Sequence, residues 1–96
     1  MSAYVVVDLK IIHPEAFGEY KRLVKPMIEK FGGAYRARGG SMDVRETDLW
    51  SPNRVVIIEF PDVATAQAFL DSDEYASIKP LRTDNAESTL LILEGV

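Results

Sequence analysis

The sequence contains no cysteine, and this absence excludes disulfide bridges, thiolate zinc sites and cysteine nucleophiles. Basic residues are also few: 11 lysines and arginines stand against 15 aspartates and glutamates, which leaves a formal net charge of −4. Phosphate binding requires a clustered basic surface and no Lys/Arg cluster occurs, so we expect no nucleic-acid partner. The only histidine, His13, has no companion ligands, so we expect no metal site, and no cofactor motif is present.

Long apolar runs are missing as well. The first apolar run, residues 4–12, is too short for a membrane-spanning helix and lacks the basic flank and cleavage site of a signal peptide. We therefore expect a cytoplasmic protein without a membrane segment. The 96 residues, of which 47% are hydrophobic, are enough for one domain over residues 1–96 with its own apolar core.

The spacing of apolar residues predicts strands that alternate with helices along the chain. Strands are expected over residues 4–12, 34–38, 54–60 and 88–94. The second strand is interrupted by two glycines and is expected to continue over 43–47. A helix begins at Pro14, carries apolar residues at spacings of three and four, is bent by Pro26 and ends at a Gly-Gly pair. Asp62 and Ser72 are the expected N-caps of two shorter helices.

The order β-α-β-β-α-β is typical of a ferredoxin-like α+β fold, in which helices cover one face of a four-stranded antiparallel sheet. Such a sheet should alternate apolar and polar residues, yet Val55 and Ile57 are as apolar as Val56 and Ile58 on the other side of the same strand. The last strand is also apolar on both faces. We therefore expect a homodimer in which a second copy covers the open sheet face.

Several segments resemble one known family. They are Gly32–Gly40, Trp50–Pro61, Ser72–Tyr75 and the pair Leu81-Arg82. Together they resemble the family called domain of unknown function 1330 over essentially the whole chain. The resemblance implies a dimeric α+β barrel, a superfamily that also contains cofactor-free monooxygenases, muconolactone isomerases and some haem-binding members. It implies no particular reaction.

Two charged residues, Arg38 and Glu59, lie on strands whose neighbours are apolar. A buried charge is tolerated when it is paired or when it meets a ligand. One hypothesis is that Arg38 and Arg82 hold a carboxylate or enolate while Glu59 acts as a general base or orients Arg38. The alternative is that Arg38 and Glu59 form a structural ion pair that fixes the strand register or the dimer interface.

Several aromatic residues are candidates for the lining of a binding site. Tyr20, Tyr35 and Tyr75 are expected to line a pocket between helix and sheet, with core packing as the alternative role for each. Trp50 either closes this pocket or covers a sheet edge. Asp8 is expected to form a salt bridge at the rim of the sheet, with a catalytic role as the alternative.

These residues predict a protein that binds an anionic or oxygenated small molecule. The resemblance implies, through its superfamily, cofactor-free isomerase-like or monooxygenase-like chemistry as one role of such a site. The alternative is a non-catalytic ligand-binding or dimerisation module.

Overall fold

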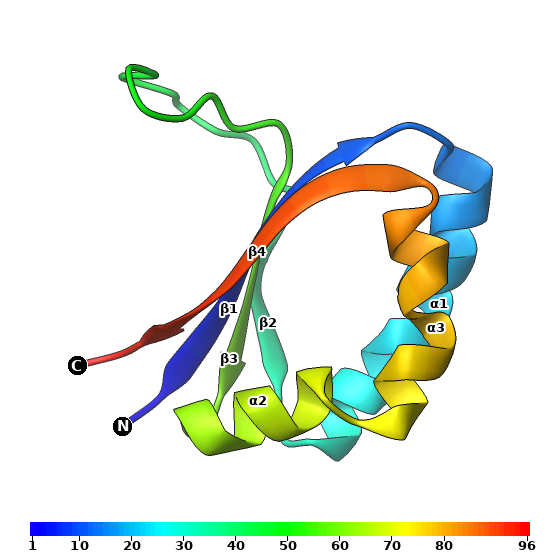
Figure 1. The fold of residues 1–96 in the computed structure, drawn as a ribbon. Helices are drawn as coiled ribbons and strands as arrows, with labels where there is room; N and C mark the ends of the chain where they lie inside the picture. The colour runs from blue at the N-terminus through cyan, green and yellow to red at the C-terminus, as the bar shows by residue number, and fades with distance from the viewer.

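A four-stranded antiparallel sheet with three helices on one side makes up the computed structural model, which describes residues 1–96 (Figure 1). In chain order the elements are β1 (Ala3–Ile11), α1 (Pro14–Lys30), β2 (Ala34–Arg38), β3 (Val55–Phe60), α2 (Val63–Leu70), α3 (Asp73–Thr83) and β4 (Ala86–Glu94). The strands lie in the order β2-β3-β1-β4, and each neighbouring pair is antiparallel. This arrangement confirms the predicted ferredoxin-like α+β fold.

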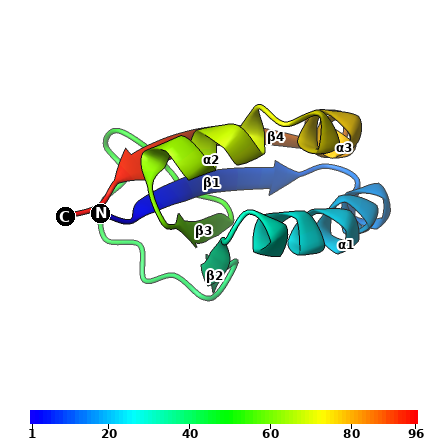
Figure 2. The ribbon, with the colours of Figure 1, turned by 90° about the horizontal axis from the view of Figure 1, so that it is seen from below.

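The helices pack on the sheet through one apolar side each. On α1 the predicted stripe is confirmed, because Phe17, Val24 and Ile28 are buried in the core. The helix ends before Gly32, whose φ of 79° lies in the left-handed region that glycine adopts without strain. Figure 2 shows α1 and α3 at one end of the sheet and α2 towards the end that carries both termini. None of the three helices combines the length and the apolar composition needed to cross a membrane.

The uncovered side of the sheet, here called the open face, carries a mixed set of side chains. It consists of Tyr4, Val6, Asp8, Val55, Ile57, Glu59, Leu91 and Leu93. On the side of the helices, Val5, Val7 and Ile58 are buried. On the open face, by contrast, Leu91 and Leu93 are 45% and 57% exposed. The sequence-based expectation of apolar residues on both faces is therefore met, and one apolar surface lies in solvent in the isolated chain.

The segment between β2 and β3, residues 39–54, contains no strand, so the predicted continuation of the second strand over 43–47 is wrong. Val44 is the one apolar residue of that stretch, so the stretch offers no apolar face that could pack on the core. The loop projects away from the helices, beyond the open face (Figure 1). Within it, Leu49 is 99% exposed.

The pairing of β2 with β3 contains a bulge. The Cα partners are Tyr35 with Ile58, Ala37 with Ile57 and Arg38 with Val56, so the register shifts by one residue after Tyr35. Strict alternation would place Arg36 and Arg38 on the same face of the sheet. Because of the bulge, Arg38 lies on the side of the helices, whereas Arg36 contacts Glu59 on the open face.

Gly33 marks a place where the core admits no side chain. A Cβ atom there would lie 2.7 Å from Ile28 Cγ2 and 2.7 Å from Phe60 Cε1, and both side chains are fully buried. We expect Gly33→Ala to lower the free energy of unfolding by about 1–3 kcal/mol, because overpacking displaces well-packed neighbours. Urea denaturation measures this loss. Gly40→Ala is the control, since a Cβ at Gly40 meets nothing within 4 Å. Equal losses in the two variants would contradict the packing argument.

Candidate functional site

A cavity lies between the sheet and the helices. Its lining residues are Val5, Val7, Leu9, Phe17, Tyr20, Lys21, Val24, Ile28, Tyr35, Arg38, Arg54, Val56, Ile58, Phe69, Leu70, Tyr75, Arg82 and Leu90. The cavity has a volume of about 40 Å³. The hollow between these side chains measures about 510 Å³ when its open mouth is included. The smaller volume decides what fits without movement, and it has room for about three water molecules. A larger ligand requires side chains at the mouth to move.

The cavity is lined by cations and by no acid. Lys21, Arg38, Arg54 and Arg82 all contribute to its wall, whereas no aspartate or glutamate does. This excess of positive charge occurs in a chain whose net charge is −4. A wall of this kind favours an anion, because each cation is otherwise left to solvent or to neutral groups.

Arg82 is the most deeply placed of these cations. It is 7% exposed and lies on α3 without an acidic partner. Its Nε donates a hydrogen bond of 3.2 Å to the hydroxyl of Tyr75, and its Nη1 donates to the hydroxyl of Ser88 on β4. A buried guanidinium that meets only neutral hydroxyl groups keeps its whole charge available to a bound anion.

The three tyrosines that the sequence predicted for this pocket all line it. The hydroxyl groups of Tyr20 and Tyr75 lie 2.9 Å apart and form a hydrogen bond. Burial, and then the neighbouring Tyr75, raise the pKa of the Tyr20 hydroxyl far above its ordinary value, whereas Arg82 lowers it less. Burial also raises the pKa of Tyr35. Tyr20 and Tyr35 therefore stay protonated near neutral pH and act as neutral hydrogen-bonding groups.

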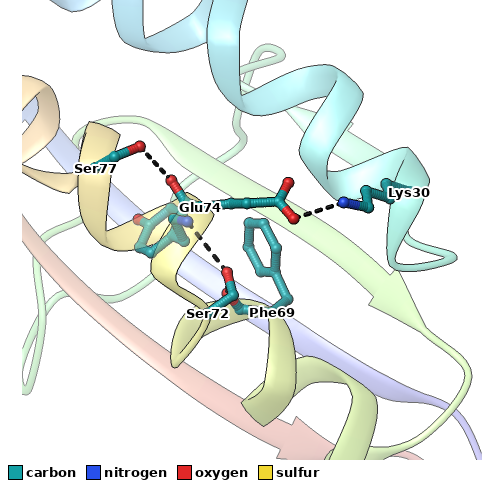
Figure 3. Close-up of polar contacts among 6 residues, drawn as sticks. Lys30, Phe69, Ser72, Glu74 and Ser77 are labelled. Atoms are coloured by element: carbon teal, nitrogen blue, oxygen red, sulfur yellow. Dashed lines mark hydrogen bonds and ion pairs between the residues drawn. The ribbon is translucent and has the colours of Figure 1, made fainter.

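The start of α3 holds Tyr75 in place (Figure 3). The hydroxyl of Ser72 accepts a 3.1 Å hydrogen bond from the backbone N–H of Tyr75 and donates one of 2.7 Å to the carbonyl oxygen of Phe69. Glu74 forms an ion pair of 2.5 Å with Lys30 at the end of α1. The cap orders the first turn of α3, and the ion pair joins α3 to α1, so the two helices that carry the hydrogen-bonded tyrosines are in contact.

The mouth of the cavity is formed by β2 and by the residue that precedes β3. The guanidinium carbon of Arg38 lies 4.4 Å from the centre of the Tyr35 ring, a cation–π contact. Arg54 lies against Gly39, where a Cβ would come within 2.5 Å of Arg54 Nε. Gly39 has a φ of 69°, a left-handed conformation that glycine adopts without strain.

Two predicted site residues lie elsewhere. The expectation that Glu59 faces Arg38 is wrong, because Glu59 is on the open face and pairs with Arg36 at 2.8 Å. Hydrogen bonds from the Ser2 hydroxyl and then from Arg36 hold the pKa of Glu59 below its usual range. Trp50 is not in the cavity wall either, since its indole N–H donates to Asp8 on the open face. The Arg38–Glu59 ion pair of the sequence-based alternative is therefore wrong as well, and the pair that forms is Arg36–Glu59.

Asp8 is buried rather than placed at the rim, so the expected rim salt bridge is wrong. It is 8% exposed and accepts hydrogen bonds from Trp50 Nε1 at 2.7 Å and from the backbone N–H groups of Asn53 and Arg54 at 2.8 and 3.0 Å. Burial raises the pKa of Asp8, but these hydrogen bonds outweigh it and hold the pKa below its ordinary value. Asp8 thus anchors the end of the 39–54 loop.

The sequence-based prediction missed Lys21 and Arg54, although both positions carry a detectable signal. Lys21 follows Tyr20 on the apolar side of α1, and Arg54 precedes a strand whose alternate members Val56 and Ile58 face the core. No three histidine, aspartate or glutamate side chains lie close enough together to hold a metal ion.

A sequence model of one family matches residues 2–96 of the chain, and the family is described as a domain of unknown function (DUF1330). The chain belongs to the DUF1330 family. This match confirms the resemblance seen in the sequence. No curated protein matches this DUF1330 chain in sequence.

Solved structures share the fold of the DUF1330 chain at low sequence identity. A protein of unknown function from Rhodopseudomonas palustris is 18% identical with a TM-score of 0.75, and the match covers 99% of this chain and 82% of that one. A dimeric ferredoxin-like protein of unknown function from Jannaschia sp. CCS1 is 14% identical with a TM-score of 0.75, covering 99% and 100%. SnoaB, a cofactor-independent oxygenase from Streptomyces nogalater, is 12% identical with a TM-score of 0.66, covering 99% and 93%. These likenesses show the ferredoxin-like fold.

We expect Asp8→Asn to reduce stability in a pH-dependent way. The folded-state pKa of Asp8 lies below the unfolded value of about 3.9, so ionised Asp8 stabilises the fold above about pH 4. That stabilisation is lost as the pH falls through the lowered pKa. Urea denaturation at pH 7 should show a loss of about 1–3 kcal/mol in the variant.

The difference in the free energy of unfolding between Asp8→Asn and the wild type should be smaller at pH 3 than at pH 7. Asp43→Asn is the matched control, because Asp43 is an exposed carboxylate of the same loop and should change stability by less than about 0.5 kcal/mol. An equal difference in the free energy of unfolding at both pH values would show that the charge of Asp8 contributes nothing to stability.

Proposed function

We propose that this DUF1330 protein binds an anionic small molecule in the cavity between its sheet and its helices. The observation that carries the proposal is the wall of four cations, Lys21, Arg38, Arg54 and Arg82, without one acidic residue. The remaining wall is largely apolar, which is the usual composition of a small-molecule site. A ligand with an apolar body and an anionic group therefore fits both parts of this wall.

The two arginines at the mouth and the one inside have different roles in this proposal. Arg38 and Arg54 border solvent and attract an anion through the field at the entrance. Arg82 is shielded from solvent, and its interaction with a bound oxygen is less screened by water and salt. Tyr20, Tyr35 and Tyr75 are positioned to orient the ligand.

The cavity can stabilise negative charge but has no side chain suited to remove a proton. No histidine or carboxylate lines it, and Glu59 lies on the other face of the sheet. The fold shared with the oxygenase SnoaB raises the possibility of isomerase-like or monooxygenase-like chemistry. In such chemistry the cavity would stabilise an enolate or carbanion. We therefore propose ligand binding as the main function. Catalysis would require a substrate that loses its proton without a base from the protein.

A thermal-shift screen against small carboxylates, phenols and phosphorylated metabolites tests the proposal. A ligand present at one hundred times its Kd adds about 2.7 kcal/mol of stability, which raises the Tm of a domain of this size by roughly 10 °C or more. We expect a shift in the wild type that shrinks in Arg38→Ala and Arg54→Ala, because both lose a cation of the cavity.

The matched control for the screen is Arg22→Ala, which removes a cation from the exposed side of α1, where Arg22 pairs with Glu19. It should keep the full shift. If no anion raises the Tm of the wild type, or if the Tm shift falls as much in Arg22→Ala as in Arg38→Ala, the cavity is not an anion site.

We also propose that two copies of the chain form a homodimer through their open faces. Val6 pairs with Ile57 on one side and with Leu91 on the other, so these residues and the exposed Leu93 form one continuous apolar surface. Face-to-face packing of two such sheets buries this surface around a twofold axis. The Jannaschia protein of the same fold, described as dimeric, supports the proposal.

Leu93→Asp should dissociate this dimer. The substitution places an unpaired carboxylate of each copy in an apolar interface, which we expect to raise the dimer Kd at least a hundredfold, about 3 kcal/mol. Analytical ultracentrifugation reads the mass directly. Ala64→Asp adds the same charge on the exposed side of α2 and should leave the mass unchanged. A wild type that sediments as a monomer at high micromolar concentration would rule out the dimer.

A further inference from the structure

We infer that the inner end of the cavity, formed by Tyr20, Tyr75 and Arg82, is an oxyanion site that binds the deprotonated oxygen of an enol, phenol or carboxylic acid in preference to the neutral acid. This inference rests on the proposed function and names the group that the cavity recognises. It follows from the number and direction of the hydrogen bonds at this end.

Arg82 has more donors than partners. A guanidinium carries five N–H groups and cannot accept a hydrogen bond. Arg82 uses one donor on Tyr75 and one on Ser88, and its Nη2 makes no hydrogen bond within the chain. No enclosed side-chain nitrogen or oxygen in the structure lacks a partner, so Nη2 is accessible to solvent or to a ligand. Arg82 lines the cavity and therefore has donors to offer to a bound anion.

The two tyrosines add a further unpaired donor. Because Arg82 only donates, the oxygen of Tyr75 accepts its hydrogen bond. The contact between Tyr75 and Tyr20 then uses one of their two hydroxyl hydrogens, whichever of them donates. The other hydroxyl hydrogen has no acceptor in the chain. Donation from Arg82 also polarises Tyr75, and such chains of hydrogen bonds strengthen one another.

The inner end offers no strong acceptor to balance these donors. No carboxylate lines the cavity, and the oxygens at this end belong to neutral hydroxyl groups, of which that of Tyr75 already accepts a hydrogen bond from Arg82. A neutral phenol or carboxylic acid would bring a hydrogen that finds no strong acceptor, whereas its anion brings only acceptors. The site therefore discriminates between the two protonation states of one ligand.

The space and the walls restrict the ligand further. The cavity volume of about 40 Å³ leaves little room, so the ligand group that enters is small and flat, such as a single oxygen or a planar carboxylate. Phe69, whose ring centre lies 5.0 Å from that of Tyr75, also lines the cavity, so the body of the ligand adjoining the oxyanion meets an apolar wall. The fitting class is a flat, mostly apolar molecule with a single oxyanion.

A spectrophotometric titration of 4-nitrophenol tests the inference, because this phenol ionises near neutral pH and its anion is coloured. In the presence of excess wild-type protein, the pKa of the bound reporter should fall by about one unit, which corresponds to tenfold tighter binding of the anion than of the acid. Tyr75→Phe and Arg82→Met should each remove most of this shift. Tyr20→Phe, which removes only an oxygen at a half-buried position, should reduce it without disturbing the fold.

Tyr4→Phe is the matched control, since Tyr4 lies on the open face and should leave the reporter's pKa shift unchanged. If 4-nitrophenol binds in an Arg38-dependent manner but keeps its solution pKa, the oxyanion site is overturned while anion binding by the cavity stands. If neither the reporter nor any anion of the thermal screen binds, both proposals fail. A pKa shift that survives in Tyr20→Phe and Tyr75→Phe would also overturn the oxyanion site.

Discussion

The bulge between β2 and β3 decides the distribution of charge in this protein. A sheet sends successive side chains to opposite faces, so one inserted residue exchanges the faces of everything beyond it. Here the exchange sends Arg38 to the cavity and leaves Arg36 beside Glu59 on the open face. Without the bulge, both arginines would lie on the open face, and the mouth of the cavity would lose one of its cations.

Separation of charge between the two faces follows from this constraint. The carboxylates of Asp8 and Glu59 lie on the open face, and hydrogen bonds there hold the pKa of each below its ordinary value. The polar side chains that line the cavity on the other side are cations and neutral hydroxyl groups only. A chain with an excess of acid can thus present a positive interior, because the sheet between the two faces keeps the opposite charges from neutralising one another at contact distance.

The elements of the fold could be predicted because their pattern is local: β-branched residues alternate over 4–12, and α1 repeats its apolar stripe. The three tyrosines of the cavity could be placed for the same reason. The partner of Glu59 could not, because the bulge falls inside the five residues Ala34–Arg38, which contain no glycine or proline to announce it. The two glycines that interrupt the second strand in the sequence, Gly39 and Gly40, come after the bulge, and Gly39 has a left-handed φ of 69°.

The 39–54 loop connects the two faces through a single residue. The backbone N–H of Arg54 is held by Asp8 on the open face, while its side chain lines the cavity beside Gly39. The position of one cation in the proposed anion site therefore depends on a carboxylate on the opposite side of the sheet. Trp50 and Asn53 of the same loop also donate to Asp8, so one carboxylate holds three groups of this loop through hydrogen bonds of 3.0 Å or less.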